Sequence, residues 1–175
     1  MYCVGDLILY GRTGVCKVEE IIEEVPRGEK EPRQFYSLRP LYQNCCIRTP
    51  VDGGKVYTRP IISEGEAQRL IRRIPEVEAS PYHNRNLNQL REYYRAWLER
   101  FDCESLIGMT KSLYLKKQEA ESQKRKFGAV DERYMKEAED LLYGEFAAAL
   151  EIDRDKVENY IACSLSPAEA ASVSV

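Results

Sequence analysis

The chain has 175 residues, an apolar content of 43% and a net charge of −3. This length allows one domain or two small ones with packed cores, and the charge excludes a protein that coats nucleic acid non-specifically. No apolar run approaches the ~20 residues that cross a bilayer, and the start lacks the pattern of a signal peptide. We therefore expect a cytoplasmic protein without membrane contact.

The first third of the chain has a β pattern. Glycines at both ends of Gly11–Gly14 suit a tight turn, because glycine reaches positive φ at little cost. Pro40 indicates an edge or a bulge in its strand. The predicted strands cover 7–10, 15–22, 35–42, 45–51 and 55–61, with a polar hairpin loop over 23–34 and an Asp52-Gly53-Gly54 turn. Short strands joined by such turns predict a small open barrel of the SH3 or Tudor kind.

From Ser63 onward the pattern becomes helical. Ser63, Asn86 and Asp102 have the spacing of helix N-caps, and Pro75 ends the first helix. The later predicted helices cover 86–101, 102–122, 129–150 and 153–161. Beyond them, Ser166-Pro167 with Glu169 could cap one more turn.

The pattern therefore predicts an α+β, multi-domain chain. An N-terminal SH3/Tudor-like β-barrel is expected over residues 1–62. A compact C-terminal helical bundle is expected over 63–163, followed by a flexible tail over 164–175.

No constellation for catalysis or metal binding is visible. The six cysteines contain no C-x-x-C pair, and His83 is the only histidine, so we expect no metal site and reduced, mostly buried thiols. His83 lies in the proline-flanked linker 76–85, and phosphate-binding glycine motifs are absent. We expect no enzyme, no cofactor and no small-molecule substrate, although an activity abolished by changing His83 would contradict this.

Two features suggest binding surfaces instead. The strand CCIRTP (45–50) carries Arg48 and ends at Pro50, so it is either an exposed edge that accepts a partner strand or an ordinary paired strand. The helical half carries basic residues near aromatic ones, which could neutralise phosphates or form a solvated helix face. Trp97 lies on an apolar stripe and is expected in the core rather than as a wedge between DNA bases.

The opening stretch VGDLILYGRTGVCKVEEI (4–21) resembles the start of the CarD/CdnL family of bacterial transcription regulators, whose barrel also occurs in transcription-repair coupling factor. The similarity continues through YSLRPLYQNCCIRTPVDGGKVYTRPIISEGEAQRLIRRI (36–74), YRAWLERFDCESL (94–106) and GAVDERYMKEAEDLLYGEFAAAL (128–150). It covers roughly residues 1–160, and the barrel, the capped helix and the bundle follow one another in the same order as in the family.

The resemblance implies a mechanism with two partners. The barrel docks on the β subunit of RNA polymerase by edge-strand pairing. The helical domain contacts promoter DNA upstream of the melted region, weakly and largely without sequence specificity, and stabilises the open complex. Tethering to polymerase raises the local concentration, so a modest basic face suffices. The resemblance thus places the protein at the nucleoid, with Arg48 as the polymerase-contacting arginine, flanked by Cys46, Ile47, Thr49 and Pro50.

The chain also departs from the family pattern. A second polymerase-contacting basic position falls near Glu24, which is acidic. The family's DNA-wedging tryptophan, at the start of the second helix of the C-terminal half, aligns with Leu90. The expected DNA contacts are Leu90, Arg91, Arg95, Lys124, Arg125, Lys126 and Arg133. These departures favour an alternative, a polymerase-bound or other protein-interaction adapter without significant DNA binding.

Overall fold

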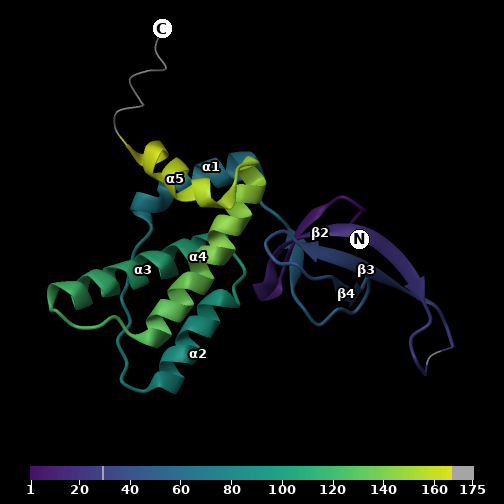
Figure 1. Ribbon diagram of the computed structural model, residues 1–175, viewed down its shortest axis with the longest axis horizontal. Helices are drawn as coiled ribbons and strands as arrows, with labels where there is room; N and C mark the ends of the chain where they lie inside the picture. Colours follow the sequence, from purple (N-terminus) through teal and green to yellow (C-terminus); the bar gives the residue numbers. More distant parts are fainter. Residues whose placement is uncertain (29, 167–175) are drawn as a thin grey trace, which may run out of the picture. The chain divides into compact units, whose positions relative to one another are not determined.

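The computed structural model describes residues 1–28 and 30–166, and the chain is α+β. It divides into two compact units, Met1–Ile61 and Ile62–Val175. Antiparallel strands form the first unit and helices form the second (Figure 1). Of the predicted tail over 164–175, Ser164 and Leu165 belong to the last helix and Ser166 is its C-cap. Residues 167–175, which the further turn predicted after Ser166 requires, lie outside the described residues.

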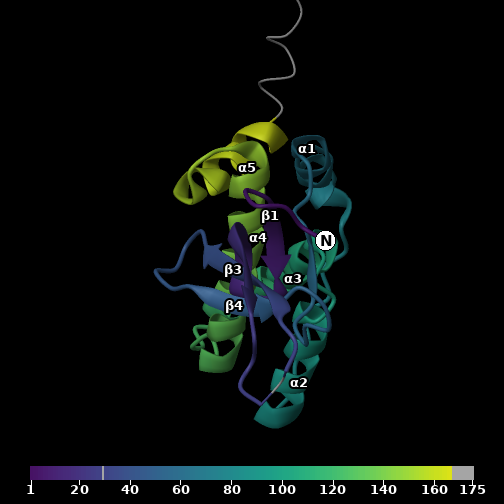
Figure 2. The ribbon, with the colours of Figure 1, turned by 90° about the vertical axis from the view of Figure 1, so that its right-hand side faces the viewer.

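The first unit is one open antiparallel sheet. Its strands are β1 (Leu7–Tyr10), β2 (Gly14–Glu24), β3 (Arg33–Pro40), β4 (Ile47–Pro50) and β5 (Thr58–Pro60). The strand order is β4-β3-β2-β1-β5, so β4 and β5 are the two edges. Figure 2 shows β4 beside β3. Because the described edge strands do not pair with each other, the sheet is not closed and the predicted barrel is not confirmed.

The turn between β1 and β2 follows from its glycines. Gly11 has φ +47° and Gly14 has φ +91°, as the prediction of a glycine turn requires. A Cβ atom at Gly11 would lie 2.7 Å from Cγ1 of Val56. A larger residue here would have to adopt a left-handed backbone conformation and displace the Val56 side chain, which explains the glycine.

The strand limits differ from the prediction in two ways. Polar residues lengthen the pairing of β2 with β3, and turns shorten β4 and β5. β2 and β3 pair as far as Glu24 and Arg33, which shortens the predicted loop. Pro40 ends β3, which is a central strand, but β4 pairs only with residues 35–38, so Pro40 lies at a local edge of the sheet. The ladder's irregularity falls instead between Val18 and Glu20 in β2. β4 and β5 are shorter than the strands predicted over 45–51 and 55–61.

The sheet has its own hydrophobic core. Side chains from one face of the central strands fill it, and Ile47 of the edge strand packs against them. The fully buried members are Ile8, Cys16, Val18 and Leu38. Alternate residues of each strand face this core. On the opposite face Leu9 and Val15 are also buried, whereas Lys17, Arg39 and Arg48 are exposed.

The second unit contains α1 (Glu64–Arg73), α2 (Leu87–Leu98), α3 (Cys103–Ser122), α4 (Ala129–Leu150) and α5 (Val157–Leu165). The predicted N-caps are confirmed. The Ser63 side chain accepts the backbone N–H of Glu66, Asn86 accepts those of Asn88 and Gln89, and Asp102 accepts that of Ser105. Each cap satisfies helix donors that would otherwise lack partners.

Two helix ends differ from the prediction. Pro75 lies in a 3₁₀ turn (Ile74–Glu76) that follows α1. The last helix was expected over 153–161, but a 3₁₀ turn (Arg154–Lys156) precedes α5, which runs to Leu165. The polar residues at the start of the predicted range therefore form the tighter turn rather than the helix.

Helix α4 is the centre of the bundle, because it contacts α1, α2, α3 and α5 (Figure 1). Its fully buried Phe146 and Ala138 explain this position. Trp97 is half-buried against the core and packs near Gly108 of α3, as expected for a core residue. None of the described helices is long and apolar enough to cross a membrane.

Candidate functional site: an exposed sheet edge and a basic groove

Strand β4 presents two kinds of side chain in alternation. Ile47 packs against the sheet core, and Thr49 is only 6% exposed. Arg48 lies on the opposite face with a side chain that is 57% exposed, and Pro50 is half-buried. Of the residues expected to contact polymerase, Arg48 and the exposed Cys46 thus offer accessible side chains, whereas Ile47 and Thr49 hold the strand in place.

The outer edge of β4 offers few backbone donors. Val51 donates its N–H to the carbonyl of Gln34 in the β3 segment (2.9 Å). In an antiparallel ladder the N–H groups alternate in direction, so Ile47 and Thr49 face β3 while Arg48 and Pro50 face away. Proline has no N–H. Within β4, Arg48 therefore carries the outward backbone donor, and Arg48 and Pro50 carry the outward acceptors.

The opposite edge is built in the same way. Ile61 donates to the carbonyl of Leu7 and Gly11 donates to that of Tyr57. By alternation Pro60 faces away from β1, as proline does in edge strands. Thr58 then carries the outward donor of β5. Because β5 has only three residues, β4 is the longer exposed edge.

An ion pair restrains Arg48. Its Nη1 lies 2.7 Å from Oε1 and 3.0 Å from Oε2 of Glu24 on β2. Both side chains are largely exposed, and exposed pairs contribute only about 0–1 kcal/mol. Glu24, which the sequence placed at an expected basic position, therefore orients the Arg48 guanidinium but can release it to a stronger acidic partner.

The helical unit contains a groove of about 500 Å³ with a basic rim. Exposed Arg85, Arg125 and Lys126 border it, next to the apolar Leu87 and the half-buried Phe127. These three cations form no ion pair with any residue that the structure describes. The groove therefore presents unneutralised positive charge beside exposed apolar surface, a combination suited to a nucleic-acid backbone.

A buried ionic network forms the floor of this groove. Asp131 accepts hydrogen bonds from the Tyr94 hydroxyl (2.5 Å) and from Nζ of Lys116 (2.8 Å). Lys116 also donates to the backbone carbonyl of Tyr82 (2.9 Å). Burial, reinforced by the bond to Asp131, raises the pKa of Tyr94, so the phenol stays protonated. Tyr94, Lys116 and Asp131, here called the Asp131 network, join α2, α3 and α4 and fix the groove's shape.

Only some of the predicted DNA contacts gather at the groove. Arg125 and Lys126 line it, whereas Lys124 precedes them with φ +53° at the end of α3. Exposed Arg95 lies on α2 and exposed Arg133 on α4. Arg91 is half-buried and donates to the Asn88 side chain (3.1 Å).

Leu90 is not available as a wedge, and this prediction is corrected. It is 3% exposed and packs in the helical core beneath α2. Leu87, the first residue of α2, is 52% exposed and borders the groove. Sequence spacing places both leucines on one stripe. Leu87 lies on the first turn of α2, which extends beyond the core, whereas Leu90 lies one turn later over the core.

The remaining candidate groups have ordinary surroundings. His83 is exposed, as a linker residue is expected to be, and its Nε2 lies 3.1 Å from Oε2 of Glu119. The prediction of mostly buried thiols is wrong, because Cys16 and Cys103 are buried whereas the other four are exposed. Cys16 is one of two buried thiols, and burial raises its pKa to about 12, so it is unreactive at neutral pH.

The chain matches no model of a known protein family. A comparison with curated proteins likewise finds no significant match. Its function must therefore be argued from its own residues and their arrangement.

Proposed function

We propose that this protein is a transcription regulator that docks on the β subunit of RNA polymerase through the β4 edge. Its helical unit would contact promoter DNA just upstream of the melted region and stabilise the open complex. A Tudor-like classification of the strand unit belongs to this proposal and is supported by its short antiparallel strands.

One observation carries the docking half of the proposal. Arg48 combines an exposed guanidinium with the outward backbone N–H and carbonyl of the edge strand. A partner strand that pairs with β4 would meet this backbone and this charge together, so one residue serves both affinity and orientation. The buried Thr49 and the packed Ile47 hold that residue in a fixed position.

The DNA half rests on the basic groove. Arg85, Arg125 and Lys126 could neutralise phosphates without reading sequence. Leu87, rather than Leu90, meets the requirement for an exposed apolar residue at the start of α2, where it could press against a base step. Because polymerase would hold the unit near the promoter, the net charge of −3 does not oppose this contact.

A second function, an adapter without DNA binding, is favoured by the burial of Leu90 and by the absence of an exposed tryptophan on α2. Both functions require docking through β4. They differ only in whether the groove contributes to the promoter complex, so separate variants of the edge and of the groove distinguish them.

The docking test measures binding to the N-terminal lobes of a bacterial polymerase β subunit by calorimetry. We expect Arg48→Glu to weaken binding at least tenfold, since it opposes an acidic partner and also repels Glu24. Lys17→Glu makes the same charge reversal on the exposed face of β2 and should bind like the native chain. Failure of the native chain to bind, or unchanged binding by Arg48→Glu, would contradict the proposal.

A pair of variants isolates the backbone contribution. Arg48→Ala removes the side chain, whereas Arg48→Pro also removes the outward N–H while leaving the ladder bonds to β3 intact. Strand pairing predicts that the proline variant binds several-fold more weakly than the alanine variant. If these two variants bind equally well and have unchanged circular dichroism spectra, the partner contacts the Arg48 side chain and strand addition is excluded.

The DNA test measures the lifetime of a promoter open complex with polymerase and this protein. We expect the double variant Arg125→Glu with Lys126→Glu to shorten that lifetime severalfold and to reduce its dependence on salt, because phosphate contacts are lost. Leu87→Ala should shorten it independently of salt. Arg72→Glu, on the exposed face of α1, is the matched control. If every groove variant keeps the native lifetime while docking persists, the protein is an adapter.

A further inference from the structure

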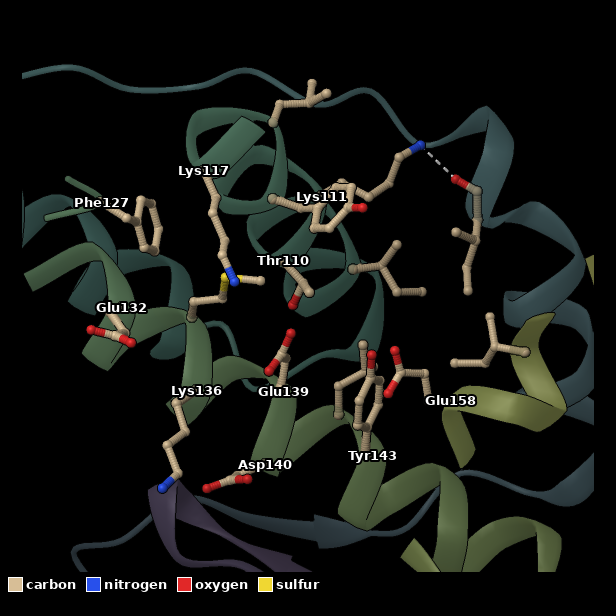
Figure 3. A pocket seen from close by; sticks show the side chains of 17 residues that line it. Thr110, Lys111, Lys117, Phe127, Glu132, Lys136, Glu139, Asp140, Tyr143 and Glu158 are labelled. Atoms are coloured by element: carbon tan, nitrogen blue, oxygen red, sulfur yellow. Dashed lines mark hydrogen bonds between the residues drawn. The ribbon is translucent and has the colours of Figure 1, made fainter. Parts of the chain in front are cut away.

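A second cavity, of about 870 Å³, lies in the helical unit and shares only Phe127 with the lining of the basic groove. Residues of α3, α4 and α5 line it, and most of its wall is apolar, including Ile107, Met135, Leu142 and Ile161. Its volume lies within the range of small-molecule sites. Figure 3 shows polar side chains pointing into this space between the apolar ones.

Two carboxylates share one side of this cavity. Glu139 of α4 and Glu158 of α5 lie near the Tyr143 ring, as Figure 3 shows. Burial, with the charges of Glu139 and Glu158, raises the pKa of Tyr143 to about 12. Neither carboxylate forms an ion pair or hydrogen bond with another described residue. Two negative groups thus face each other across a phenol, and Lys117 of the same lining offsets the charge of Glu139 only in part.

The other charged groups around the cavity do not resolve this repulsion. Lys111 donates to the backbone carbonyls of Ile74 (2.7 Å) and Val77 (2.5 Å), and Asp140 pairs with Arg154. Burial raises the pKa of Glu139, as do Glu158 and Asp140, while Lys117 lowers it. Burial and the neighbouring carboxylates therefore disfavour the ionised form of Glu139, and a bound cation would favour it.

An independent observation also indicates a missing partner. The Thr110 hydroxyl oxygen is buried and lacks a hydrogen-bond partner among the described residues. Figure 3 shows Thr110 projecting from α3 into the cavity toward Glu139. A buried hydroxyl without a partner costs roughly 1–3 kcal/mol, so a ligand with N–H donors would relieve this cost and the carboxylate repulsion together.

We propose that this cavity binds a small organic primary amine, with its ammonium group between Glu139, Glu158 and the Thr110 hydroxyl and its apolar body along α3 and α4. The three N–H groups of an ammonium match these three acceptors. Tyr143 adds an aromatic surface for the cation. The chain's own C-terminus cannot supply the cation, because residues 167–175 contain no lysine or arginine. Thr110, Glu139 and Glu158 take no part in the proposed docking and DNA contacts.

The test measures binding of the probe 4-phenylbutylamine to the full chain, by calorimetry and by NMR. We expect saturable one-to-one binding, with at least tenfold weaker binding of 4-phenylbutyrate, whose body is the same and whose charge is opposite. Chemical-shift changes should centre on Tyr143 and Ile161 rather than on the basic groove.

Variants assign the site. Glu139→Gln and Glu158→Gln should each weaken amine binding at least tenfold, and Thr110→Val should weaken it to a smaller extent while raising the melting temperature of the unliganded chain. Glu92→Gln, an exposed glutamate on α2, is the control and should bind like the native chain. The proposal is overturned if the native chain shows no saturable binding, if the anionic probe binds equally well, or if the folded Glu139→Gln and Glu158→Gln variants bind as tightly as the native chain.

Discussion

Replacing Asp131 with asparagine is expected to lower the free energy of unfolding by about 3–5 kcal/mol. The Asp131 carboxylate is buried and neutralises Lys116, whose side chain is also largely buried. Asparagine can still accept a hydrogen bond from Tyr94, but it leaves the ammonium without a counter-charge. Chemical denaturation monitored by circular dichroism measures the loss.

Two further variants serve as a control and as a test of whether the unpaired Lys116 charge causes the loss. Asp140→Asn removes a carboxylate from the same helix, but the Asp140–Arg154 pair is partly exposed, so the loss should stay below about 1 kcal/mol. Adding Lys116→Met to Asp131→Asn removes the unpaired charge and should restore part of the stability. A loss below about 1 kcal/mol for Asp131→Asn would refute the assigned role of the charge. So would a double variant whose free energy of unfolding falls by more than the sum of the losses of the two single variants.

A second large effect is expected at Glu145 of α4, which is 0% exposed. Its Oε1 accepts the backbone N–H of Ile62 (3.0 Å), and its Oε2 accepts the Cys103 thiol (3.3 Å). Glu145→Ala opens a cavity and leaves a backbone donor unsatisfied, so we expect a loss of about 2–4 kcal/mol. Thermal and urea unfolding of the full chain measure it.

The conservative variant Glu145→Gln keeps an acceptor for Ile62 and should lose less than half as much stability as the alanine variant. Hydrogen exchange gives an independent readout, because the Ile62 amide should lose protection in Glu145→Ala but keep it in Glu145→Gln. Glu92→Ala, an exposed glutamate on α2, should change the stability by less than about 0.5 kcal/mol. Unaltered protection of the Ile62 amide in the alanine variant would contradict the anchoring role.

Local features of the fold could be predicted because their causes lie within a few residues. The caps at Ser63, Asn86 and Asp102 are hydrogen bonds to residues two or three positions ahead. The glycine turn before β2 likewise depends on local backbone angles. Such features need no knowledge of how distant segments pack.

Other features depend on register and packing, which the sequence pattern does not contain. The outward position of Pro50 follows from the bond between Val51 and Gln34, so it could not be known before the pairing of β3 with β4. Leu87 and Leu90 have the same helical spacing, and only the surrounding core separates them. The amine cavity requires α3, α4 and α5 together, and no sequence motif connects Thr110, Glu139 and Glu158.

The two outward prolines also bear on how the sheet unit avoids aggregation. An open sheet extends readily into a fibril when consecutive backbone donors along an edge are free to pair with the next copy. Pro50 and Pro60 interrupt that series on both edges, so a growing stack of copies would lack regular hydrogen bonds at each junction. The proposed partner strand would meet the same interruption, so its backbone pairing with β4 would be limited to the short stretch around Arg48.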